Sequence, residues 1–412
     1  MARNQADIII VGGGMVGLTT ALALAKSNLS LVVIDHTAFS LPSTDAPQDL
    51  RVSAITRASQ NIFRNLGSWD NIQALGVSGY DKMHVWDASG KGAISFDAAD
   101  LAEPDLGHII ENKNIRAGLW QSIKALSLKK ANNITLLAPV KATKVIWDDK
   151  GGLLTLDNGD TWRGKLLVAA DGANSWLRNQ RKIAVSKKPY GHHALVCNIQ
   201  TENNHQACAW QRFISTGPLA LLPLKDEHSC SIVWSTSAQQ ASQLKALSEQ
   251  DFNEQLSHAF EHKLGKLTVT SERLSFPLIK GHVERYVDDG IALVGDAAHT
   301  IHPLAGQGVN LGLVDAACLA EVILKALQKN QNISSRQVLR PYERWRRSEN
   351  QLMLDAMGFF RYLFDGEQLM KTLFRNTAMS SLDKFTALKR EVILRAMGLK
   401  GDLPNLTHSL RD

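Results

Sequence analysis

Residues 7–35, DIIIVGGGMVGLTTALALAKSNLSLVVID, contain the pattern that decides the fold of this chain. A short β-branched run leads into the G-x-G-x-x-G spacing formed by Gly12, Gly14 and Gly17. Between a strand and a helix, such glycines permit a tight turn, close approach of a pyrophosphate and packing of the helix on the strand. A second strand ends at Asp35, where an acid can accept hydrogen bonds from a ribose. The pattern predicts a dinucleotide-binding β-α-β unit without identifying the nucleotide.

Two other interpretations of this stretch are weaker. Residues 8–25 carry no charge and approach the length of a membrane span, and the Ala-Leu alternation at 21–25 is similar to a signal-peptide cleavage region. However, glycines are concentrated in the first half of that run, and Arg3 alone precedes it, set against Asp7. We therefore favour the nucleotide site over export or membrane insertion.

Length and composition indicate a soluble protein of two or three domains. The chain has 412 residues, of which 44% are hydrophobic and 21% charged. The four cysteines are scattered and form no C-x-x-C pair, so we expect neither disulfides nor a cysteine zinc site, and a reducing cytoplasm fits. His192 and His193 are adjacent on an expected strand and point to opposite faces, so we expect no metal site there.

The positive charge is concentrated at the C-terminal end. Residues 325–412 contain 16 basic and 9 acidic residues, whereas the protein as a whole carries +6. Zinc-finger spacing and aromatic RNA-binding signatures are absent, so we expect no nucleic-acid partner. Basic and apolar residues alternate in this segment, which favours an anionic membrane surface; packing on the protein itself or on a partner subunit remains an equal alternative.

Periodicity along the rest of the chain predicts further elements. Helical spacing predicts helices over 56–75, 114–128 and 309–327, and alternation predicts a strand pair over 80–97 and a β-meander over 134–168. From about 182 to 283 the pattern predicts a mostly antiparallel domain interrupted by one amphipathic helix.

Two more turns follow buried strands. Asp171-Gly172 follows the first strand, and Gly295-Asp296 follows the second, before a glycine-rich start of the helix at 309. An acid at a strand end followed by a helix start is typical of a ligand-facing turn, although the first turn alone could be only a capped helix. Arg51, in the loop after Asp35, could contact a ligand, but from its position alone a surface role is favoured.

The three turns together resemble those of the flavin-dependent aromatic hydroxylases of the para-hydroxybenzoate hydroxylase fold. The segment GDAAHTIHPLAGQGVNLG, with RVSAI, LGHIIEN and DGANSWLRN, resembles the ubiquinone-biosynthesis hydroxylases, in particular the 2-octaprenylphenol hydroxylase branch. The resemblance implies an α/β (α+β) fold with a Rossmann-like FAD-binding domain, an inserted antiparallel β substrate domain and a C-terminal helical segment. The expected boundaries are 1–75, 105–181 and 283–330 for FAD, 76–104 and 182–282 for substrate, and 331–412 for the C-terminal segment.

The resemblance also assigns roles to residues. Those expected along the AMP half of FAD are Gly12, Gly14, Met15, Val16, Gly17 and Asp35, with the adenine near Val140. Arg51 is expected against the flavin side of the cofactor, Asn112 near its ribityl or phosphate region, and Asp296, with Gly295, along the ribityl chain. Asp171 and Arg178 are expected to serve the Asp-Gly motif, which in the family is associated with both FAD and nicotinamide. Those expected to border the isoalloxazine are Pro303, Gly306, Gln307, Gly308, Val309 and Asn310. Asp35 stands where many relatives have Glu.

The activity implied is ring hydroxylation of a polyprenylphenol with NAD(P)H and O₂, through a flavin C4a-hydroperoxide. One G-x-G-x-x-G predicts that the nicotinamide binds transiently. His299 is a candidate base for activating the phenol, with bracing of its turn as the alternative. The expected location is cytoplasmic, peripheral on the inner membrane, beside other ubiquinone-biosynthesis proteins. The alternatives are a sister hydroxylase, another flavin monooxygenase or a non-catalytic flavin-bound scaffold.

Overall fold

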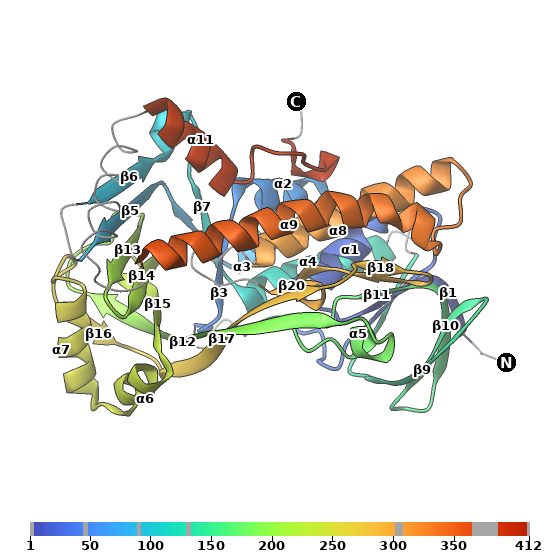
Figure 1. The fold of residues 1–412 in the computed structure, drawn as a ribbon, viewed down its shortest axis with the longest axis horizontal. Coiled ribbons are helices and arrows are strands. Elements are labelled where there is room, and N and C mark those ends of the chain that lie inside the picture. Colours follow the sequence, from blue (N-terminus) through green and yellow to red (C-terminus); the bar gives the residue numbers. More distant parts are fainter. Residues whose placement is uncertain are drawn as a thin grey trace.

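A computed structural model describes residues 4–43, 48–88, 92–128, 133–300, 308–364 and 386–409. The first sheet has the order β18-β19-β11-β1-β2-β8, and β10 and β9 extend it beside β11 (Figure 1). The strands are β1 (Asn4–Val11), β2 (Leu31–Ile34), β8 (Ile134–Leu137), β9 (Ala142–Asp148), β10 (Gly151–Leu156), β11 (Thr161–Ala169), β18 (Val287–Asp288) and β19 (Ile291–Leu293). β1 pairs in parallel with both β11 and β2.

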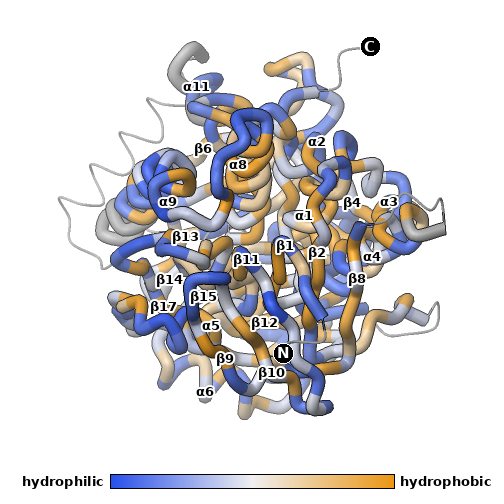
Figure 2. Tube along the Cα trace, turned by 90° about the vertical axis from the view of Figure 1, so that its right-hand side faces the viewer, coloured by the Kyte–Doolittle hydropathy of each residue, from blue (hydrophilic) through white to orange (hydrophobic). Residues whose placement is uncertain are grey.

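The central strands of this sheet are buried on both faces. Residues 8–11 of β1 and all of β2 are buried, as expected for a parallel sheet covered on each side. Helices α1 (Met15–Leu24) and α8 (Gly308–Gln328) pack together against the sheet, and both show apolar stretches in Figure 2. The β-α-β unit predicted for 7–35 is confirmed, and so is the α/β fold class.

The second sheet has the order β20-β17-β12-β15-β14-β13-β5-β6, with β16 beside β12. Its strands are β5 (Lys82–Asp87), β6 (Ala93–Asp97), β12 (Val185–Thr201), β13 (Cys208–Ile214), β14 (Gly217–Pro223), β15 (Ser229–Ser237), β16 (Leu267–Val269), β17 (Leu274–Val283) and β20 (His299–Thr300). All these pairings are antiparallel except that of β13 with β5. We call this sheet the substrate sheet, after the domain predicted there.

A small third sheet joins the two larger ones. It contains β3 (Val52–Ile55), β7 (Gly107–Glu111) and β4 (Ser78–Tyr80), in the order β3-β7-β4. Helix α4 (Asn112–Leu128) continues directly from β7, as the periodicity from 114 predicted. The short 3-10 helices are η1 (Ala98–Leu101), η2 (Gly295–Ala297) and η3 (Asn405–Thr407), and α5 spans Trp176–Gln180.

Three sequence predictions need correction. The helix expected over 56–75 is two helices, α2 (Arg57–Asn65) and α3 (Trp69–Leu75), because Gly67 turns the chain with φ 67°. The single helix expected in the substrate block is also two, α6 (Ala238–Ala246) and α7 (Glu249–Ala259). In the expected meander over 134–168, β8 instead pairs in parallel with β2.

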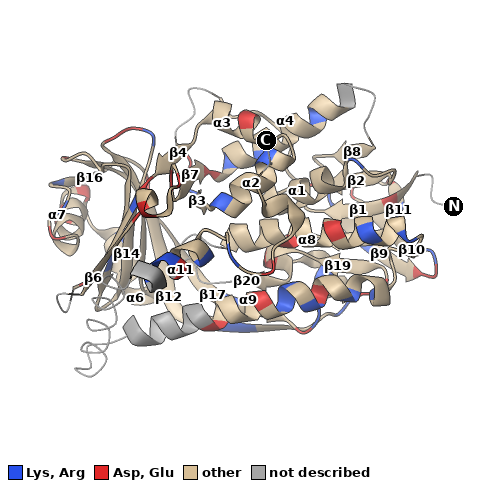
Figure 3. Cartoon of the chain, turned by 90° about the horizontal axis from the view of Figure 1, so that it is seen from above, with Lys and Arg blue, Asp and Glu red and all other residues tan. Residues whose placement is uncertain are grey.

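The C-terminal part is helical where it is described. α9 (Arg336–Phe364) packs along α8, and α11 (Thr386–Ala396) leads to Met397, whose carbonyl accepts a hydrogen bond from the Ala58 N–H. Figure 3 shows Lys and Arg in bands along α9. Within the described ranges, none of the helices combines the length and apolar character that crossing a bilayer would need.

Candidate functional site

The glycine turn between β1 and α1 separates two kinds of glycine. A side chain at Gly12, where φ is 110°, would collide with the Ala170 carbonyl, and one at Gly17 would collide with the Gly12 carbonyl. A side chain at Gly14 would meet no atom within 4 Å. No side chain caps α1 at Gly14, so its first turn is open to an anion. Gly12 and Gly17 therefore serve the fold, whereas Gly14 keeps a space free at the helix N-terminus.

Asp35 lies directly against this turn. Its carboxylate accepts hydrogen bonds from the Gly13 N–H and the Thr37 N–H, both at 2.6 Å. The Val140 N–H donates to the Asp35 carbonyl at 2.9 Å, which brings the residue expected near the adenine beside the one expected at the ribose. The structure thus gathers the predicted AMP-side residues at one end of the sheet.

Arg116, which the sequence did not single out, fastens this region. From α4 its guanidinium donates to the carbonyls of Gly13 (2.9 Å), Thr37 (2.9 Å) and Ala38 (3.1 Å), and it lies 3.5 Å from the Asp35 carboxylate. All four partners of Arg116 are distant from it in sequence, so the residues next to it give no indication of this role.

The turn after β11 lies against the glycine turn. Asp171 accepts a hydrogen bond from the Leu177 N–H at 3.0 Å, while its Oδ1 is buried without a partner. Burial raises the pKa of this carboxyl. Arg178 is buried and donates to the carbonyls of Ala297 (2.9 Å) and Ala173 (3.0 Å), so its side chain joins two of the turns. This placement favours a positioning role for Arg178 over direct cofactor contact.

The turn after β19 completes the set. Gly295 has φ 58°, and a side chain there would lie 3.2 Å from Val16, so the start of α1 packs against this turn. Met15, one residue earlier, is partly buried against the same core. Asp296 is exposed, with no hydrogen-bond partner among the described residues. Its carboxylate is therefore an acceptor available to a ligand.

The remaining predicted residues lie on the side of the small sheet and α8. The Asn112 N–H donates to the Arg51 carbonyl at 2.9 Å, and the Ser53 hydroxyl donates to Asn112 Oδ1 at 2.7 Å. The Arg51 side chain is exposed at this junction. The two residues are thus adjacent, as a shared contact to one ligand requires.

The start of α8 is tied to the small sheet. Asn310 is buried, accepts a hydrogen bond from the Thr56 N–H at 3.1 Å and donates to the Ala54 carbonyl at 2.8 Å. Its amide is therefore used to hold α8 in place, while Gly308 and Val309 before it are partly exposed. The predicted residues that lie outside the described ranges are Pro303, Gly306 and Gln307.

His299 belongs to a buried ionic network. Its Nε2 lies 2.5 Å from Asp315 Oδ2, and its ring stacks on Tyr286. Arg346 of α9 donates to Asp315 Oδ1 at 2.8 Å, and the Gly295 N–H donates to Oδ2 at 3.0 Å. His299 and the Arg346 guanidinium hold the pKa of the Asp315 carboxyl far below its ordinary range despite full burial. This placement favours the bracing role of His299 over a catalytic one.

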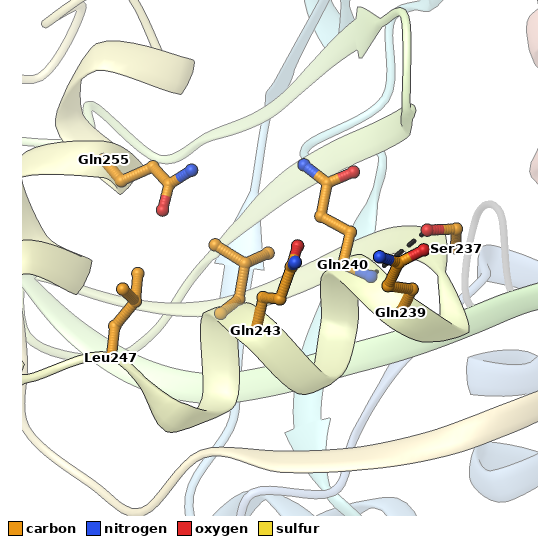
Figure 4. Close-up of a pocket in the computed structure, with 7 residues that line it drawn as sticks. Ser237, Gln239, Gln240, Gln243, Leu247 and Gln255 are labelled. Atoms are coloured by element: carbon orange, nitrogen blue, oxygen red, sulfur yellow. Dashed lines mark hydrogen bonds between the residues drawn. The ribbon is translucent and has the colours of Figure 1, made fainter.

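The described part of the chain offers little other chemistry. No group of three or more His, Cys, Asp or Glu side chains there could hold a metal ion. A pocket of about 620 Å³ on α6 and α7 is lined by amides, with Gln240, Gln243 and Gln255 around it, and contains no titratable side chain (Figure 4). It lies in the substrate block, well away from the three turns (Figure 1).

The open space at Gly14, the unpartnered Asp171 Oδ1 and the exposed Asp296 fit a dinucleotide cofactor extended across the three turns. Comparison with known proteins agrees. Residues 5–356 match the family described as FAD binding domain. The chain is 35% identical to the 3-demethoxyubiquinol 3-hydroxylase of Escherichia coli over 97% of this chain and all of that protein. It is 32% identical to the human mitochondrial ubiquinone biosynthesis monooxygenase COQ6, over 94% of this chain and 91% of that protein.

Solved structures agree on the fold. The p-nitrophenol 4-monooxygenase PnpA of Pseudomonas putida superposes with a TM-score of 0.77 at 19% identity, over 97% of this chain and 99% of that one. PqsL of Pseudomonas aeruginosa, a probable FAD-dependent monooxygenase, superposes with a TM-score of 0.74 at 20% identity, over 92% of this chain and 100% of that one.

Proposed function

The chain belongs to the FAD binding domain family, among the FAD-dependent monooxygenases that include ubiquinone-pathway hydroxylases, and on this premise we propose that it hydroxylates the ring of a polyprenylphenol. The reaction proposed is the first ring hydroxylation, at C5. The observation that carries the pathway assignment is the full-length similarity to the Escherichia coli hydroxylase. The activity in that relative's name also favours a second candidate, hydroxylation of a demethoxyubiquinol at a later step.

The FAD would be held across the three turns. Gly14 would face the pyrophosphate with the open first turn of α1, and Asp35 would face the ribose. Asp296 would accept hydrogen bonds from the ribityl chain. When bound, FAD supplies the activation of O₂ with electrons from NAD(P)H. Arg178 and the Asp315 network would keep the turns in register.

Analysis of quinone intermediates tests the step. In a strain that lacks the gene for this chain, we expect an unhydroxylated polyprenylphenol to accumulate, because the first ring hydroxylation would be missing. Accumulation of a methoxylated demethoxyquinol would instead assign the protein to the later step. Purified protein should also oxidise NAD(P)H in the presence of a prenylphenol and form hydroxylated product. FAD-loaded protein that turns over no prenylphenol would support the scaffold alternative.

We further propose that α9 docks the protein on an anionic membrane, where a polyprenyl substrate resides, with other proteins of the pathway as neighbours. Arg340 and Arg344 on α9 are exposed, and so is 57% of Leu352. Basic and apolar side chains on one helix suit an anionic lipid surface. The protein should co-sediment with vesicles containing anionic lipid, and Arg340→Glu/Arg344→Glu should reduce that fraction several-fold. Equal sedimentation of both proteins would contradict the docking proposal.

A further inference from the structure

The substrate sheet has two faces with different surroundings. Cys197 and Ile199 of β12 pack into the apolar core that α6 and α7 cover. Because side chains alternate along a strand, Asn198 between them points to the opposite side, which we call the inner face. Leu222, also on the inner face, packs against the apolar cluster of Ala54, Ile109 and Leu224, of which Ala54 and Ile109 belong to the small sheet. The inner face is therefore the one turned toward the FAD-binding part.

The centre of the inner face carries no charge. Strand pairing aligns its residues across β14, β15 and β12 in two neighbouring rows. One row contains Leu222, Ser231 and Asn198, and the other contains Ala220, Val233 and Val196. These side chains are small or apolar apart from one hydroxyl and one amide. Such a surface accommodates an aromatic ring, but it offers no cation to balance a carboxylate on that ring.

Asn198 has an unfilled hydrogen-bonding position. It is 4% exposed, and its Oδ1 is buried without a donor among the described residues. Its backbone is fully used, because the N–H donates to the Ser271 hydroxyl at 2.8 Å and the carbonyl accepts from the Thr270 N–H at 2.9 Å. A buried acceptor that lacks a donor is rare in native proteins and calls for an explanation such as a ligand.

The distance to the cofactor region suits a single ring. Asn198 and Leu222 are separated by two strand spacings, roughly 10 Å. Ala54, a member of the cluster that Leu222 packs against, accepts a hydrogen bond from Asn310 at the start of α8. A ring that lies over Ser231 would thus reach from the Asn198 amide toward the region where the isoalloxazine is expected.

We propose that Asn198 is a specificity-determining residue whose Oδ1 accepts a hydrogen bond from the hydroxyl of an uncharged phenol. The charge-free inner face selects that phenol over its ring-carboxylated counterpart. This inference rests on the proposed function and deepens it, because it names the state of the ring that the site accepts: a protonated hydroxyl and no carboxylate.

The proposal is tested by measuring how tightly three probes bind to the FAD-loaded protein, with the change in flavin absorbance as the signal. The probes are 2-(3-methylbut-2-enyl)phenol, its methyl ether and 4-hydroxy-3-(3-methylbut-2-enyl)benzoate. The wild type should bind the phenol at least about threefold more tightly than either of the other two, because the ether lacks the O–H donor and the benzoate carries a charge that the inner face does not balance. Comparable affinities for all three would overturn the proposal without any variant being needed.

Asn198→Leu isolates the amide. The variant should bind the phenol about 3- to 10-fold more weakly than the wild type does, and its affinity for the methyl ether should be unchanged. The preference for the phenol therefore disappears. Gln200→Leu, the same kind of change at an exposed position of the same strand, should preserve that preference. An Asn198→Leu protein that keeps the preference would refute the role of Asn198, whereas a wild type that hydroxylates no prenylphenol would refute the proposed function instead.

Discussion

Asp315→Ala should lower the free energy of unfolding by about 3–5 kcal/mol, the cost typical of breaking a buried ion pair by removing one partner. Asp315 and Arg346 are almost fully buried, and the carboxylate is also bound to His299 and to the Gly295 N–H. Alanine would leave the Arg346 guanidinium in the interior without its counter-ion. Urea unfolding of the FAD-free protein, followed by circular dichroism, measures the loss.

Two comparisons show whether the loss comes from the buried charge. Lys325→Ala on the same helix removes a 62% exposed partner of Glu321 and should cost less than about 1 kcal/mol. The double variant Asp315→Leu/Arg346→Met should recover part of the loss, because neither charge is then left alone. If the double variant is no more stable than Asp315→Ala, the loss of unfolding free energy comes from packing and not from the buried charge.

The pH dependence of this loss has a definite sign. The folded pKa of Asp315 is depressed, so its contribution is complete above the ordinary aspartate pKa of about 3.9 and disappears as the pH falls toward the folded pKa. The difference in stability between wild type and Asp315→Ala should therefore stay constant near neutral pH and narrow only below about pH 4. A difference that already narrows well above pH 4 would show that the loss does not come from the Asp315 carboxylate.

Local patterns were enough to predict the nucleotide-binding unit. Gly12, Gly17 and Asp35 act within a continuous stretch, and each glycine is required by atoms of the adjoining turn or strand. The break between α2 and α3 was not predictable in the same way, because the apolar spacing continues across Gly67 while only its backbone conformation ends the helix. The domain boundaries and the assigned cofactor contacts stay predictions.

The supports of the site were harder to find because their partners are far apart in sequence. Asp315 and Arg346 are on different helices, and Arg116 holds residues of a loop about eighty positions earlier. One signal was available. Asp315 is the sole charged residue of α8 before Glu321, and a lone acid in an apolar helix must be buried with a partner. Which partner it has depends on how α9 packs, and periodicity does not give that.

Gly14→Val should yield a folded protein that retains almost no FAD. The structure places no atom within 4 Å of a side chain at Gly14, so valine can be accommodated while it fills the space at the open N-terminus of α1. A pyrophosphate could then no longer approach the helix N–H groups. Flavin absorbance of the purified protein should fall from near one FAD per chain to less than about a tenth.

Gly17→Val is the matched comparison. It lies three residues further along the same turn, where a side chain would collide with the Gly12 carbonyl, so this variant should lose the fold rather than only the cofactor. Circular dichroism separates the two outcomes, because Gly14→Val should melt like the FAD-free wild type and Gly17→Val should not. A Gly14→Val protein that stays yellow at full stoichiometry would show that the pyrophosphate lies elsewhere. If both variants unfold alike, the open space at Gly14 is needed by the fold, and its role in binding FAD must be abandoned.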